Sequence, residues 1–71
     1  MLSEAGIGLA RADRSIAEAE RNVALLEAMI PEMAAQGYST AEVETQIALL
    51  SQMLVHLKTQ RWEIEGMLGT P

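Results

Sequence analysis

Apolar residues recur along the first half of the chain at the spacing of a long amphipathic helix. They form two rows whose members are seven positions apart: Leu9, Ile16, Val23 and Ile30, followed at three positions further on by Ala12, Ala19, Leu26 and Met33. Alternating steps of three and four residues place both rows on one side of a helix, as in the heptads of a coiled coil. The pattern predicts a helix over about residues 8–35. Gly6 and Gly8 disfavour an earlier start, for which Ser3 would be the helix cap.

The second half of the chain repeats this pattern. Its rows are Val43, Leu50, Leu57 and Ile64, followed at four positions further on by Ile47, Leu54, Arg61 and Leu68. The spacing predicts a second helix over about residues 40–68. Gly69-Thr70-Pro71 is a sequence that ends a helix, because glycine adopts the conformation of a helix end and proline cannot continue one.

Residues 36–39 are predicted to form a turn between the two helices. Gly37 can take the left-handed backbone conformation that ends a helix. Ser39 and Glu42 have the spacing of a capping box at the start of the next helix. Because the connection is short, the helices are expected to lie side by side and antiparallel. The sequence therefore predicts an all-α fold, in which the 71 residues form a single helical-hairpin domain with coiled-coil-like packing.

Pro31 interrupts the first predicted helix. A proline inside a helix removes one backbone hydrogen bond and crowds the carbonyl group of Glu27, four residues earlier. Ile30 and Met33 keep the heptad phase across it, which favours a continuous helix with a kink near residues 27–31. The alternative is a helix that stops at this point and resumes as a short turn.

The apolar stripe of each helix is wider than one helix–helix seam can cover. Leu25 and Met29 lie beside the first seam, and Leu49 and Met53 lie beside the second. Stripes of this width are typical of helices that pack against more than one neighbour. A second copy of the chain would supply the missing neighbours in a homodimeric four-helix bundle. The alternative is that a different protein covers these four residues.

Trp62 is a fifth candidate interface residue. Its ring offers a large rigid surface at little entropic cost, and tryptophan is common among the residues that dominate binding energy. The alternative is a ring that lies over the edge of the bundle and covers core residues.

Arg61 occupies a position in the second apolar row. Antiparallel pairing places it opposite Ala12 or Ala19, where Asp13 or Glu20 is the neighbouring acid. We expect the aliphatic stem to lie along the seam while the guanidinium group reaches one of these carboxylates. Such a polar residue in an apolar seam often fixes the register of the helices.

Charge and composition restrict the classes of partner. The formal net charge is −5 and the chain has no cysteine. Nucleic acids and anionic membrane surfaces are bound through clustered lysine and arginine, so neither is an expected partner. The start of the chain lacks the basic and apolar regions of a signal peptide, and no apolar run is long enough to span a membrane. We expect a cytoplasmic protein, in keeping with the lack of cysteine.

Four glutamates lie near the predicted turn: Glu27, Glu32, Glu42 and Glu44. No lysine or arginine lies between Arg21 and Lys58. Two hairpins joined in opposite directions would bring acidic turns near basic ends. The acidic turn also suggests a second hypothesis, in which the chain is a small inhibitor that occupies a basic site on a larger protein, such as a phage or defence component.

No catalytic, cofactor-binding or metal-binding residues are predicted. The run His56-Leu57-Lys58 resembles in part the phospho-accepting motif of histidine kinases, but the spacing to the basic residue is one position short. Two pairs of glutamates are spaced by two, Glu18 with Glu20 and Glu63 with Glu65, so their carboxylates point to different sides of a helix. We therefore expect a non-enzymatic structural or adaptor protein that acts through helix–helix contacts.

Three segments carry a resemblance to a known group of proteins: Ala19-Glu20-Arg21, the run from Gly37 to Glu42, and the leucine-rich stretch from Leu49 through Leu57 to Arg61. Together they resemble short uncharacterised helical-hairpin proteins of rhizobia and related alphaproteobacteria. That group often has a histidine before its terminal arginine-rich helix end, where this chain has Thr59-Gln60. The resemblance implies a helical hairpin of bacterial origin and no particular activity.

Overall fold

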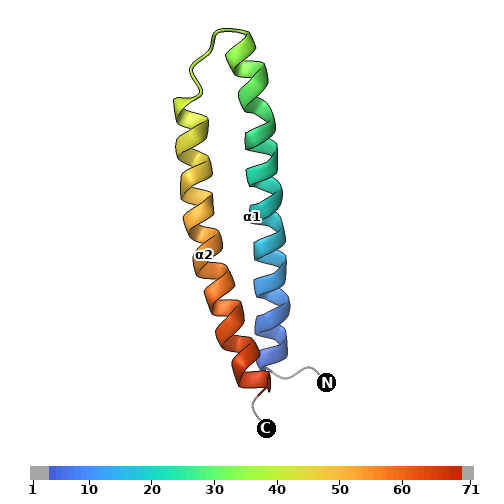
Figure 1. Ribbon diagram of the computed structural model, residues 1–71. Helices are drawn as coiled ribbons and strands as arrows, with labels where there is room; N and C mark the ends of the chain where they lie inside the picture. The colour runs from blue at the N-terminus through green and yellow to red at the C-terminus, as the bar shows by residue number, and fades with distance from the viewer. Residues whose placement is uncertain (1–3, 70–71) are drawn as a thin grey trace.

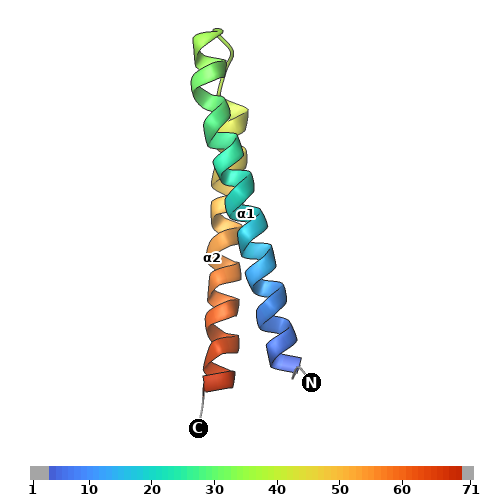
Figure 2. The same ribbon diagram turned by 90° about the vertical axis from the view of Figure 1, so that its right-hand side faces the viewer.

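The computed structural model describes residues 4–69, which form two helices joined by a short turn (Figure 1). Helix α1 spans Glu4–Ala35 and helix α2 spans Ala41–Gly69. The helices lie side by side and run in opposite directions, so that the start of α1 and the end of α2 lie at the same end of the molecule (Figures 1 and 2). No strand occurs in this part of the chain. The predicted all-α hairpin is therefore confirmed.

Helix α1 is longer than the sequence predicts and is not interrupted. It begins at Glu4 rather than near residue 8 and continues through Pro31 to its end. The acidic side chain of Glu4 is favourable at a helix start because it complements the positive end of the helix dipole. The alternative of a helix that stops at Pro31 is therefore wrong, while a kink there stays a prediction. The proposed cap Ser3 lies outside the described residues, as do residues 70–71.

The end of α1 follows the hydrogen-bonding pattern known as the Schellman motif. Gly37 has a φ angle of +81°, the left-handed conformation predicted for it. The Tyr38 N–H donates to the Met33 carbonyl at 2.9 Å, and the Gly37 N–H donates to the Ala34 carbonyl at 3.1 Å. These bonds satisfy carbonyl groups that have no partner within the helix and turn the chain toward α2.

The start of α2 differs from the prediction by one residue. The Thr40 carbonyl accepts a bond of 2.9 Å from the Glu44 N–H, so Thr40 rather than Ser39 precedes the first helical turn. The Thr40 hydroxyl also donates to the Glu44 carboxylate at 3.2 Å. Ser39 instead accepts a bond of 3.3 Å from the Ala41 N–H, two residues on. The predicted capping box of Ser39 with Glu42 is therefore wrong, because the serine hydroxyl takes part in a local turn.

The core of the hairpin is a single layer of side chains along the seam. Its most buried members are Ala12, Ile16, Ala19 and Val43. The other members of the predicted rows are half-buried, except Leu68, which is exposed. The radius of gyration is 16.4 Å, compared with about 11 Å for a compact domain of this length. The hairpin is thus a rod that hides little of its apolar surface from water.

Candidate protein-interaction surface

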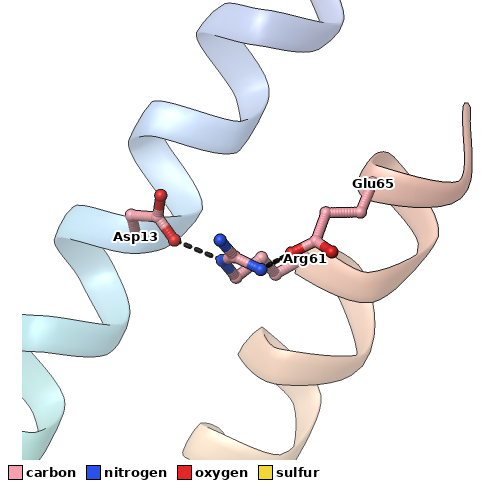
Figure 3. A network of polar contacts seen from close by, with 3 residues as sticks. All are labelled: Asp13, Arg61 and Glu65. Carbon is pink, nitrogen blue, oxygen red and sulfur yellow. Dashed lines mark hydrogen bonds and ion pairs between the residues drawn. The ribbon is translucent and has the colours of Figure 1, made fainter. Parts of the chain in front are cut away.

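Arg61 links the two helices through an ion pair with Asp13. Its Nε donates to the Asp13 Oδ1, and its terminal nitrogen pairs with the Glu65 carboxylate one turn further along α2 (Figure 3). The Arg61 side chain is 37% exposed, less than that of either acid. Of the two acids predicted to receive Arg61, the structure therefore selects Asp13.

The second predicted acid, Glu20, pairs with Lys58 instead. The Lys58 Nζ lies 3.7 Å from the Glu20 carboxylate, and both side chains are more than half exposed. This pair and the Arg61 network lie along the same side of the seam. An exposed ion pair of this kind contributes little to stability.

Helical spacing defines the two long sides of the hairpin. Each residue advances by about 100° around a helix. Residues that directly follow Ala12 and Ala19 therefore lie on one side of the seam, and residues that directly precede Ile16 and Val23 lie on the other. The first side carries the ion pairs of Asp13 with Arg61 and of Glu20 with Lys58, and we call it the polar face. A shallow groove on the opposite side is lined by Ser15, Glu18, Ala19 and Asn22 of α1 and by Leu50, Met53 and Leu57 of α2.

Four of the five predicted interface residues lie on this opposite side, which we call the apolar face. They are Leu25, Met29, Leu49 and Met53, with exposed fractions of 61%, 44%, 60% and 50%. Their helical positions place them in the half of the hairpin nearer to the turn, where Gln46, Leu49 and Leu50 line a second hollow. The structure thus gathers two residues from each helix into one exposed apolar surface.

Trp62 is separated from the other four candidates. It is 74% exposed and lines a hollow on the polar side of α2 together with Val55, Lys58 and Thr59. A single partner that covers the apolar face would not cover Trp62 as well. This separation was not predicted from the sequence, although the position of each residue relative to the apolar rows determines on which side of the hairpin it lies.

A metal-binding cluster and a membrane-spanning helix are both absent from the described part of the chain. Residues 4–69 contain no cluster of three histidine, cysteine, aspartate or glutamate side chains that could hold a metal ion. Neither of the two described helices has a stretch that is apolar enough to cross a lipid bilayer.

Comparison of the chain with known protein families, with curated proteins and with solved structures found no match. The resemblance to rhizobial hairpin proteins stays a prediction. The exposed apolar face is therefore the feature of this molecule from which a function can be argued.

Proposed function

We propose that this protein is a non-enzymatic structural or adaptor module that acts in the cytoplasm through helix–helix contacts. We further propose that two copies associate through their apolar faces to form a four-helix bundle. The observation that supports this proposal is the exposure of Leu25, Met29, Leu49 and Met53 on one side of a hairpin whose seam is already packed.

The energetic argument rests on the thin core of the hairpin. Full burial of a leucine or methionine side chain contributes about 1.5–3 kcal/mol. The four side chains of the apolar face have 44–61% of their surface still exposed, so roughly half of that contribution is available when a partner covers them. Summed over two copies, the gain is comparable with the whole folding free energy of a small domain. This gain favours association through the apolar face and opposes the loss of translational and rotational freedom on association.

Sedimentation velocity over a range from low to high micromolar concentration tests the proposal. We expect the wild-type chain to sediment as a dimer. The double variant Leu49→Gln/Met53→Gln keeps the helix propensity of α2 and removes two apolar side chains from each copy. We expect its dissociation constant to rise by at least about 100-fold.

The matched control is Val55→Gln, which makes the same kind of change on the polar side of α2, where Val55 is 65% exposed. Its dissociation constant should remain that of the wild type. Circular dichroism should show helical spectra for all three proteins. A wild-type chain that is helical and monomeric at every concentration would contradict the proposed dimer.

A second candidate function is inhibition of a larger protein by occupation of a basic site. The observation that favours it is the absence of lysine and arginine between Arg21 and Lys58, a stretch that contains four glutamates. Binding of this kind weakens as salt is added, because salt screens interactions between exposed charges. Replacement of Glu27, Glu32, Glu42 and Glu44 by glutamine should abolish the binding of such a partner and leave the apolar-face dimer in place.

A further inference from the structure

Two apolar faces can meet around a two-fold axis in two ways. When the axis runs along the helices, the two turns lie at the same end of the bundle and α1 of each copy packs on α2 of the other. When the axis runs across the helices, the turns lie at opposite ends and each helix packs on its own counterpart. Every pair of neighbouring helices is antiparallel in both arrangements, so the helix dipoles do not distinguish them.

We infer that the two copies associate with their turns at the same end, so that Arg11 of each copy pairs with Glu63 of the other. This inference rests on the proposed dimer and names its geometry. It follows from the charged and apolar residues that lie on the apolar face itself, and it differs from the head-to-tail arrangement suggested by the overall charge distribution.

The register of the hairpin places residues of the two helices at matching heights. Asp13 pairs with Arg61, Gly8 lies against Ile64, and Asn22 lines the same groove as Met53. Counting along the helices from these contacts puts five pairs at similar distances from the turn: Arg11 with Glu63, Glu18 with His56, Leu25 with Leu49, Glu32 with Glu42, and Gly8 with Met67. Within one copy, the two members of each pair belong to different helices, and helical spacing places all of them on the apolar side.

With the turns at the same end, each residue faces its height-matched counterpart in the second copy. Arg11 then lies beside Glu63 of the second copy, twice by symmetry. Neither residue takes part in an ion pair within residues 4–69, and both side chains are exposed. The same arrangement places Leu25 against Leu49 of the second copy. Opposite charges therefore meet at one end of the apolar contact.

This arrangement also covers Met67, an apolar side chain beyond the four of the apolar face. Met67 is 69% exposed in the hairpin. In the bundle it lies opposite Gly8 of the second copy. The unfavourable contact is between Glu32 and Glu42 of the second copy, again twice by symmetry, and it lies near the solvent-exposed turns. Repulsion between exposed like charges is small.

With the turns at opposite ends, the contacts between charged side chains of the two copies are less favourable than with the turns at the same end. To keep the four apolar residues covered, the axis must pass at the height of Leu25. Glu18 then faces Glu32 of the second copy, again twice. Arg11, Glu63 and Met67 lie beyond the helices of the second copy and gain no partner. This arrangement therefore has like-charge contacts without a compensating ion pair.

Charge reversal tests the inferred pairing by sedimentation at low salt. Arg11→Glu and Glu63→Arg should each raise the dimer dissociation constant by about 5- to 10-fold, because each change replaces two attractions with two repulsions. The double variant Arg11→Glu/Glu63→Arg restores opposite charges and should return to within about 2-fold of the wild type. Arg14→Glu, on the outer surface of α1, is the matched control and should have no effect. Unchanged dimerisation in both single variants would overturn the inference.

Cysteine cross-linking tests the arrangement independently, because the chain has no cysteine of its own. With the turns at the same end, a mixture of Leu25→Cys and Leu49→Cys chains should form a disulfide between unlike chains under mild oxidation. Leu25→Cys chains alone should not cross-link. Efficient cross-linking of Leu25→Cys to itself would overturn the inferred arrangement and leave the proposed dimer intact. A wild-type chain that sediments as a monomer would instead refute the dimer itself.

Discussion

Arg61 of α2 donates to Asp13 of α1 across a seam that is otherwise lined by apolar side chains and alanine (Figure 3). The contact ties the two helices together near the open end of the hairpin, far from the turn. An apolar seam alone tolerates a shift of one heptad, because leucine, isoleucine and alanine pack without directional bonds. The ion pair penalises the shift that would place Arg61 beside Gly6, whereas the opposite shift would offer it Glu20 in place of Asp13.

Replacement of Arg61 by leucine should therefore stabilise the hairpin but make the alignment of its two helices less specific. Leucine completes the apolar row, and we expect the free energy of unfolding to rise by about 1 kcal/mol in urea denaturation. Asp13→Asn is the control, which removes the charge at an exposed position and should cost less than about 1 kcal/mol. A large loss of stability in Arg61→Leu would show that the ion pair stabilises the fold rather than aligns it.

The heptad pattern predicted the seam of the hairpin but could not fix its register. Fifteen of the sixteen residues in the predicted rows are buried or half-buried, and Leu68 is the exception. The pattern left two registers open for Arg61, because Ala12 and Ala19 are equally small and each is followed by an acid. The choice depends on how the turn and the whole seam fit together, and this is a property of the folded hairpin.

Helix ends were predicted less well than the seam, because they depend on competing local hydrogen bonds. Ser39 and Thr40 are both able to cap α2, and in the structure the Thr40 carbonyl accepts the first helical bond while the Ser39 hydroxyl accepts from the Ala41 N–H. The division of the candidate interface residues between two faces was also missed. Leu49 and Trp62 are both beside the seam in sequence, and only the two-sided geometry of the hairpin separates them.

The backbone conformation of Gly37 leads to a second prediction. Gly37→Ala places a side chain in the left-handed region, and we expect a loss of about 1–2 kcal/mol in the free energy of unfolding. Gly66→Ala is the matched control, because a Cβ atom at Gly66 meets no atom within 4 Å. That change should stabilise α2 by about 0.5–1 kcal/mol through helix propensity alone. Urea denaturation of both variants checks the two signs, and a neutral Gly37→Ala would contradict the assigned turn.

Ile16 provides a third prediction, on the core. Ile16 is 9% exposed, whereas Ile7 on the same helix is 40% exposed. Ile16→Val removes one buried carbon atom and should cost about 0.5–1.5 kcal/mol. Ile7→Val makes the identical chemical change at an exposed position and should remain within about 0.5 kcal/mol of the wild type. Thermal denaturation of both variants at one protein concentration gives the comparison, and equal effects would mean that the seam is not where the hairpin is most tightly packed.

Trp62 allows the two faces to be distinguished by fluorescence, since it is the only tryptophan in the chain. It is 74% exposed and lies on the polar side of α2. If the copies meet through their apolar faces, its emission maximum and its quenching by acrylamide should not change between concentrations that favour the monomer and those that favour the dimer. A tryptophan placed on the apolar face by Gln46→Trp, in a Trp62→Phe background, should shift to shorter wavelength as the dimer forms. A blue shift of Trp62 itself on association would place the polar face in the contact. The apolar face would then be left exposed in the dimer, and its leucine and methionine side chains would still require a further partner.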